Sequence, residues 1–170
     1  MRQLLFFLSI IFSANMTAQQ DTPKKAWLEK WENSKNYLIG IAEAMPEEHY
    51  DFKPTERQMS FKEQLMHIKG NMDWLSTTYF TDTEFKREKI APPATKDETI
   101  ALITAAFDNA KNKIATISEE TLTETVSFFA GPKSKIQILN LLQDHVSHHR
   151  GQLIVYLNLN DVEPPSFVGW

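Results

Sequence analysis

Cysteine is absent from this chain of 170 residues. Its absence excludes disulfide bonds, cysteine-based zinc sites, thiol nucleophiles and iron–sulfur clusters. Any transition metal that the chain binds must therefore be held by histidine and carboxylate side chains alone.

Glycine and basic charge are also scarce. The five glycines are isolated in the sequence, so there is no glycine-rich loop to cradle a phosphate. Eighteen lysines and arginines are scattered among 22 acidic residues, for a formal net charge of −4, whereas nucleic-acid binding needs a dense basic face. We therefore expect no nucleic-acid partner. The composition, 42% hydrophobic and 24% charged, is that of a globular chain, and its length suggests a single domain.

The longest apolar run lies at the start of the chain, where residues 1–18 have the layout of a secretory signal peptide. A basic start at Arg2 precedes an apolar run from Leu4 to Phe12, and smaller residues lead to Ala18, the best-fitting cleavage point. The run is about half as long as a membrane-spanning helix requires, although an uncleaved anchor is the alternative interpretation. We expect residues 19–170 to form a periplasmic or secreted domain without a stable membrane anchor.

Apolar residues recur at a spacing near 3.6 in four segments of the remaining chain. This periodicity predicts helices over residues 22–44, 61–79 and 134–158, and a third helix in the chain that starts near Lys96 and carries apolar residues as far as Ile114. Ser60, with Glu63 three residues further on, predicts a capping box at the start of the second helix. The stretch around Val126 is too short and isolated to predict a sheet. The pattern therefore predicts an all-α fold, a four-helix bundle.

His145 and His149 lie four residues apart in the last predicted helix, so their imidazoles stack on one face. Steps of three and four residues from this pair reach Leu142 and Tyr156, on the apolar stripe of the helix, which indicates that the pair points into the bundle. Burying two imidazoles is costly unless a metal, a hydrogen-bond network or carboxylates of other helices satisfy them. We favour a metal ion.

His67 is the natural third ligand. It lies at the edge of the apolar stripe of its own helix, in a column with Glu63 and Trp74; the alternative is a half-exposed helix residue without a metal. His148 is turned by about 100° from the second histidine of the pair, so we expect it at the rim or in solvent. His49 lies in a connection, and we expect it on the surface.

Two segments carry a resemblance to a known family. The string His-x-x-x-His-Arg-Gly-Gln-Leu from His145 to Leu153, together with the segment from Ser60 to Ile68, resembles the DinB/YfiT-like superfamily of metalloenzymes. The segments 45–54 and 161–165 also look like connections of that family. The resemblance thus covers essentially the whole chain after residue 18.

The resemblance implies a four-helix bundle, often a homodimer, with three histidine ligands at one end of a central cavity. The ligands carry over onto His67, His145 and His149, all of which are present. Family members with an assigned activity include thiol-dependent transferases and hydrolase-like or isomerase-like enzymes, and many have none. The predicted export signal is a departure from the cytoplasmic members and puts a thiol cofactor in doubt here.

Three imidazoles leave at least one coordination position open, as in catalytic rather than structural sites. Glu63, one turn before His67, is our candidate for a general base or for a partner of that imidazole, and its competing role is the helix cap. Trp74, Gln152 and Tyr156 are our candidates for pocket lining, with plain packing as the alternative.

The sequence thus leads to an exported metal-dependent hydrolase or transferase that acts on a small molecule. The alternatives are a non-catalytic metal-binding or ligand-binding bundle with a stress-related role, and a structural bundle that has lost its metal. Zinc or nickel is the first expectation for the divalent ion, and iron and manganese also accept imidazole.

Overall fold

The structure, a computed structural model, describes residues 21–87 and 91–168 and confirms the all-α four-helix bundle. Its helices are α1 (Pro23–Ala44), α2 (Phe61–Phe80), α3 (Lys96–Thr116) and α4 (Lys135–Leu159). Each predicted helix end falls within two residues of the observed one. Among the described residues, no helix combines the length and the apolarity that a bilayer crossing requires. The predicted signal peptide, residues 1–18, lies outside the described residues.

The helices begin where short polar side chains cap them. The hydroxyl oxygens of Thr22 and Thr95 accept backbone N–H groups in the first turns of α1 and α3. At α2 both halves of the predicted capping box are present: Ser60 Oγ accepts the Glu63 N–H at 3.1 Å, and Glu63 Oε2 accepts the Ser60 N–H at 2.7 Å. These caps satisfy N–H groups that have no partner inside the helix, which explains why the predicted starts are accurate.

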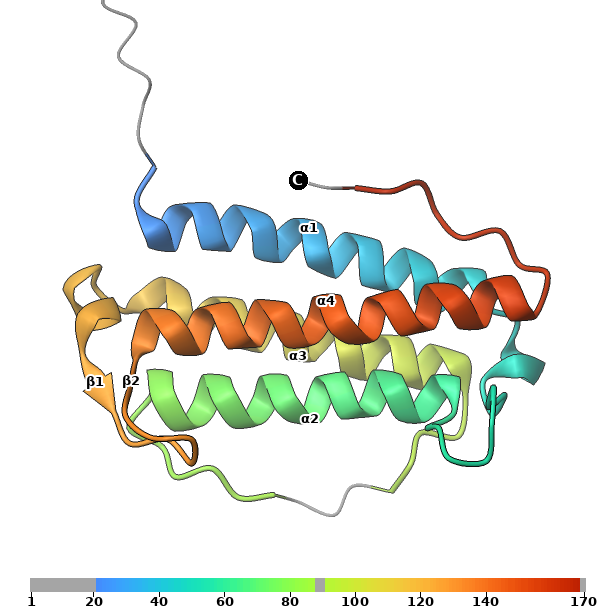
Figure 1. The fold of residues 1–170 in the computed structure, drawn as a ribbon, viewed down its shortest axis with the longest axis horizontal. Helices are drawn as coiled ribbons and strands as arrows, with labels where there is room; N and C mark the ends of the chain where they lie inside the picture. The colour runs from blue at the N-terminus through green and yellow to red at the C-terminus, as the bar shows by residue number, and fades with distance from the viewer. Residues whose placement is uncertain (1–20, 88–90, 169–170) are drawn as a thin grey trace, which may run out of the picture.

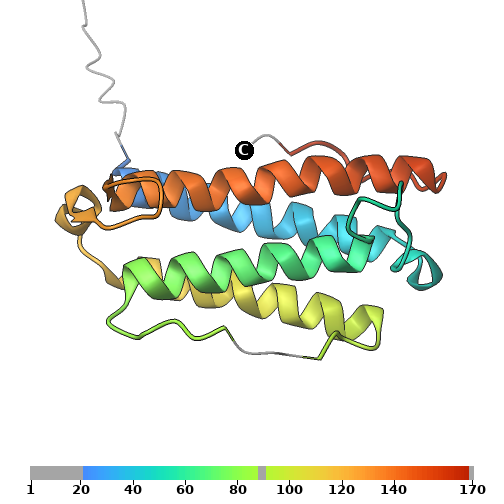
Figure 2. The same ribbon diagram turned by 60° about the horizontal axis from the view of Figure 1, so that its bottom comes forward.

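Aromatic side chains join the helices in the core. Trp31 of α1 is fully buried, and its indole Nε1–H donates to the carbonyl oxygen of Phe107 in α3 at 3.0 Å. The Trp27 ring stacks on Trp31 with a centroid distance of 4.7 Å. Figures 1 and 2 show that α2 and α4 lie side by side and run in opposite directions. Side chains of α2 and α4 therefore meet across one long interface.

A short hairpin precedes α4 and corrects the expectation that this stretch forms no sheet. Strands β1 (Thr125–Val126) and β2 (Lys133–Ser134) pair in antiparallel register, and Gly131 in the turn has a φ of 92°, which favours glycine. Two residues per strand are too few to give an alternating pattern in the sequence. Two short 3₁₀ turns, η1 (Glu47–His49) and η2 (Glu120–Thr123), complete the described elements.

The chain after α4 turns back along the bundle toward α1 (Figure 1). Phe167 makes an edge-to-face contact with Tyr37 at a centroid distance of 6.4 Å, although its side chain is largely exposed.

Candidate metal site

Helices α2 and α4 bring the three predicted ligands together. The ring centroid of His67 lies 4.9 Å from that of His145 and 4.6 Å from that of His149, and the two α4 rings are 4.5 Å apart. One nitrogen of each ring lies within 4.8 Å of the other two. His149 is buried, His145 is half-buried and His67 is exposed. The group thus extends from the α2–α4 interface to the surface.

The spacing of the ring nitrogens fits one metal ion. Two imidazole nitrogens bound to a tetrahedral zinc ion, each at 2.0–2.1 Å, are separated by about 3.3 Å. The Nε2 atoms of His67 and His145 are 3.0 Å apart, so small side-chain movements suffice to surround an ion. Within the described part of the chain the group holds three histidines and no carboxylate, which leaves a coordination position for water or a ligand.

Burial keeps these imidazoles neutral. Burial, together with a smaller effect of the neighbouring imidazoles, lowers the pKa of His145 and of His149 from 6.5 to about 4. His67 is exposed as a whole residue, but partial burial of its ring also lowers its pKa, with a smaller effect from the positive charge of Arg87. Neutral imidazole is the form that binds metal, so the three rings are ready for an ion at neutral pH.

A chain of hydrogen bonds selects the tautomer of His149. The hydroxyl of Tyr156 donates to the carbonyl oxygen of Met59 at 2.8 Å, so its oxygen accepts from Gln64 Nε2 at 3.3 Å. This orients the Gln64 amide, whose Oε1 then lies against Nδ1 of His149. Because an amide oxygen can only accept, Nδ1 carries the proton. The lone pair of His149 is therefore on Nε2, the nitrogen left for a metal.

Gln64 also donates to Oε1 of Gln152 at 2.6 Å, and Gln152 Nε2 donates to Nε2 of His148 at 2.9 Å. His148 is exposed, as expected, and does not belong to the three-histidine group. Gln152 and Tyr156 thus lie beside the group as hydrogen-bonded supports. Their contact with a ligand stays a prediction.

Sequence reasoning missed Gln64, although a signal was present. Gln64 follows Phe61 by three residues and precedes Ile68 by four, so it occupies a position of the apolar stripe of α2. It is only 2% exposed. A polar side chain in the stripe has to find partners in the core, and the imidazole, amide and hydroxyl groups of α4 are those partners.

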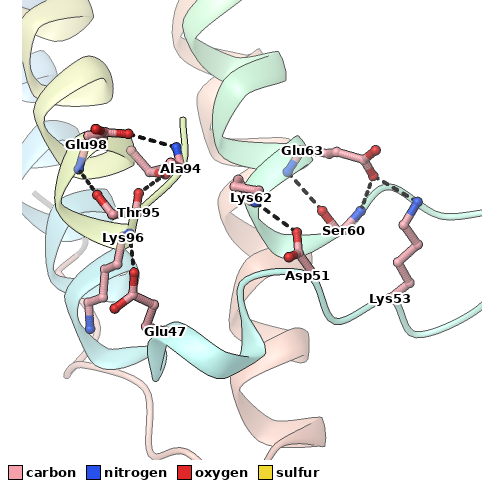
Figure 3. A network of polar contacts seen from close by, with 11 residues as sticks. Glu47, Asp51, Lys53, Ser60, Lys62, Glu63, Ala94, Thr95, Lys96 and Glu98 are labelled. Carbon is pink, nitrogen blue, oxygen red and sulfur yellow. Dashed lines mark hydrogen bonds and ion pairs between the residues drawn. The ribbon is translucent and has the colours of Figure 1, made fainter. Parts of the chain in front are cut away.

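Glu63 caps helix α2, which was the alternative to its role as a general base. Figure 3 shows its carboxylate turned toward the connection before α2, where Oε2 lies 3.0 Å from Nζ of Lys53 and accepts the Ser60 N–H. The backbone hydrogen bond from Ser60, followed by the hydrogen bond from Lys53, lowers the pKa of Glu63. A carboxyl group with a lowered pKa is a weaker base. Its role as a general base stays a prediction that these contacts do not favour.

Trp74 lies in a groove that also reaches the histidine group. The groove has a volume of about 780 Å³ and is bounded by α2, by residues 85–87 and 91–93, and by Leu102 of α3. Both His67 and Trp74 are part of its lining, whereas Gln152 and Tyr156 are not. An open metal position beside His67 is therefore next to a cavity large enough for a small molecule.

Comparisons of the sequence and of the fold with known proteins point to the same group of relatives. The uncharacterized protein YjoA of Bacillus subtilis is 26% identical over 131 residues, which cover 72% of this chain and 81% of YjoA. The crystal structure of that DinB-like protein superposes with a TM-score of 0.67 at 20% identity, over 83% of this chain and 96% of YjoA. A DinB-like protein from Bacillus cereus gives a TM-score of 0.75 at 15% identity, over 85% and 97% of the two chains. The sequence profile of the DinB family matches residues 16–169. The chain therefore belongs to the DinB family.

Proposed function

We propose that this protein is an exported metal-dependent enzyme, a hydrolase or transferase, that acts on a small molecule at the three-histidine site. The observation that carries the proposal is the convergence of three neutral imidazoles, with no carboxylate in the group, beside a groove that shares His67. A bound divalent ion supplies Lewis acidity at such a site, for example to a carbonyl group or to a water molecule. Zinc or nickel is the proposed ion, with iron or manganese as alternatives.

The residues of the chain have separate tasks in this proposal. His67, His145 and His149 hold the ion through ring nitrogens. Gln64, anchored by Tyr156, keeps the proton of His149 on Nδ1, so that Nε2 remains a ligand. The signal-peptide pattern of residues 1–18 supports a periplasmic or secreted location, and the family resemblance supports a homodimer.

A non-catalytic metal-binding or ligand-binding protein is the second candidate. Glu63, our candidate base, is engaged by its own helix cap and by Lys53. The described part of the chain places no other carboxylate in the three-histidine group. A site without a general base can bind a metal without turning over a substrate.

The experiment is a metal analysis of the untagged chain from Gln19 by plasma mass spectrometry. The His145→Ala/His149→Ala variant removes two ligands, and the His49→Ala/His148→Ala variant is the matched control, because its histidines lie outside the group. About one equivalent of metal in the wild type and the control, and none in the ligand variant, is the expected result. A wild-type protein that refuses added zinc and nickel would refute the metal site.

Turnover then separates the two candidates. We expect the metal-loaded protein, and not the ligand variant, to hydrolyse members of a panel of small esters and amides or to transfer a thiol to an electrophile. A loaded protein that is inactive on the whole panel would favour the binding protein.

A further inference from the structure

The groove beside α2 has the shape and chemistry of a binding site. In Figure 1 the described parts of the connection between α2 and α3 run below α2, and the groove lies between them and the helix. Its volume of about 780 Å³ is within the range of small-molecule pockets. His67 belongs both to its lining and to the three-histidine group, so a molecule in the groove contacts that group.

We propose that the groove binds the substrate of the three-histidine site, and that this substrate is a small molecule with a flat apolar part, a hydrogen-bond donor and an anionic group. This inference rests on the proposed function and names the class of its substrate. Four features of the groove carry it: two account for the flat apolar part, one for the hydrogen-bond donor and one for the anionic group.

The apolar part has an aromatic wall to pack against. The Trp74 ring stacks on two side chains from the tip of the β1–β2 hairpin, at centroid distances of 6.2 Å to Phe128 and 6.4 Å to Phe129, with interplanar angles of 21° and 24°. These contacts hold the indole in one orientation. A rigid ring plane at a pocket wall favours a flat apolar group. The other apolar side chains of the lining are Met66, Phe85, Ala91, Pro92, Pro93 and Leu102.

Gly70 leaves room for that group against the helix. It lies on α2 between His67 and Trp74 and is part of the groove lining. A Cβ atom added to it would meet nothing within 4 Å. Glycine inside a helix costs about 1 kcal/mol of stability relative to alanine. No close approach of another part of the described chain requires a glycine at this position. The missing side chain lets a ligand lie directly on the backbone beside His67.

Asn71 supplies an acceptor for the donor group of the ligand. It is part of the groove lining. Its Oδ1 atom is buried and has no hydrogen-bond partner among the described residues. Buried amide oxygens are rarely left without a partner. An N–H or O–H group of a molecule in the groove would satisfy this atom.

Most charged side chains of the lining are positive, and one of these cations has no ion-pair partner in the described part of the chain. Its three lysines each lie in an ion pair, whereas Arg87 makes no ion pair with any described residue and lies close enough to His67 for its charge to act on that imidazole. A guanidinium group binds carboxylate or phosphate through two parallel hydrogen bonds. We therefore assign the anionic group of the substrate to Arg87. The lysine pairs are Lys62–Asp51, Lys69–Asp73 and Lys86–Glu84.

The test uses hippurate (N-benzoylglycine), which joins a flat ring, an amide N–H and a carboxylate. The zinc-loaded chain from Gln19, labelled with ¹⁵N, is titrated with hippurate while the Gly70 amide and the Trp74 indole N–H are followed by NMR. We expect saturable shifts of both signals. Hippuramide, the neutral amide of the same molecule, should bind about tenfold more weakly, because it cannot form a charged pair with Arg87.

Two substitutions test the assignment. Gly70→Leu fills the groove and should abolish the saturable shifts. Gly151→Leu is its matched control, because a Cβ at Gly151 of α4 also meets nothing within 4 Å and Gly151 does not line the groove. Arg87→Gln should remove the preference for hippurate over hippuramide and leave the weaker binding of the ring in place.

The result distinguishes this inference from the proposed function, because the zinc content of every variant is measured as well. Zinc bound at one equivalent without a saturable hippurate shift up to about 10 mM, where even a millimolar ligand is bound, would overturn the groove inference and leave the metal site standing. Unchanged binding by Gly70→Leu, or no preference for the carboxylate, would also overturn it. Hippurate binding by a chain that takes up no metal would refute the proposed function, and with it the assignment of the groove to the metal site.

Discussion

Replacing Gln64 by alanine should weaken metal binding without touching a ligand. The substitution removes the acceptor of the His149 Nδ1–H. Without it the imidazole is free to rotate and to move its proton to Nε2, the nitrogen that the metal needs. Groups that orient a ligating imidazole contribute about 10-fold to 100-fold to metal affinity. The expected increase in the zinc Kd of Gln64→Ala is in this range, which corresponds to about 1.4–2.8 kcal/mol.

The same substitution also lowers the stability of the fold. Gln64 is 2% exposed and makes hydrogen bonds to His149, Gln152 and Tyr156. Leaving a buried polar group without a partner costs about 1–3 kcal/mol. A loss of affinity could therefore reflect partial unfolding, and a control with a similar loss of stability is required.

Gln143→Ala is that control. Gln143 of α4 also joins two helices, because its Nε2 donates to Ser34 Oγ of α1 at 2.8 Å. Its side chain bonds to Ser34 and to Ser147, and among the described residues it forms no hydrogen bond with a histidine of the group. We expect Gln143→Ala to lower the midpoint of urea unfolding and to leave the zinc Kd within about twofold of the wild type.

The assay is a competition titration of zinc against a chelating dye at neutral pH, with histidine ¹⁵N NMR to identify the protonated nitrogen of His149. Gln64→Glu provides the rescue, since its carboxylate can accept the Nδ1–H, although burying a charge lowers stability. We expect it to bind zinc more tightly than Gln64→Ala. An unchanged Kd in Gln64→Ala, or an equal loss in Gln143→Ala, would refute the tautomer argument.

Three further predictions concern stability. Burial holds the pKa of His145 and His149 at about 4 in the folded state, against the ordinary value of 6.5. Between these two pH values the unfolded chain therefore binds more protons than the folded one. The melting temperature of the metal-free protein, followed by circular dichroism, should fall as the pH drops from about 6.5 to 4 and should not change through these groups above pH 6.5. Trp31→Ala should cost about 3–5 kcal/mol in urea unfolding, because the ring is fully buried and donates to Phe107; a loss below about 1 kcal/mol would contradict its place in the core. Ser60→Ala should cost about 1 kcal/mol through the lost cap of α2, and no change in the urea midpoint would show that this cap is dispensable.

The helices could be predicted closely because their signals are local. Apolar spacing and a capping residue such as Ser60 lie within a few positions of the turn that they stabilise. The β1–β2 hairpin escaped prediction because each strand has two residues, and its pairing depends on the chain on the far side of the turn. The tip of that hairpin nevertheless orients Trp74, which the sequence could only offer as a pocket residue.

The grouping of the three histidines was predicted, whereas the side chains around them were not. The i, i+4 geometry of one helix places His145 and His149 on a common face, and the structure adds His67 to them as expected. The sequence offered Glu63 as a cap or a base with equal weight, and only the position of Lys53 gave the carboxylate a second partner at the cap. Gln64 could have been noticed as a polar residue in an apolar stripe, but its hydrogen-bond partners lie on α4 and could not be read from the sequence.

The sequence by itself determined the four helices, their caps and the stacked histidine pair, because these features arise from interactions between residues a few positions apart. The tertiary structure alone decided which side of α2 meets α4. That choice brings His67 to the pair and Gln64 to His149. The rotation and register of two packed helices depend on side chains contributed by the whole core. No local segment of the sequence contains that information. Helix geometry predicted the stacked pair, and the family resemblance added His67 to it, whereas nothing in the sequence predicted the groove.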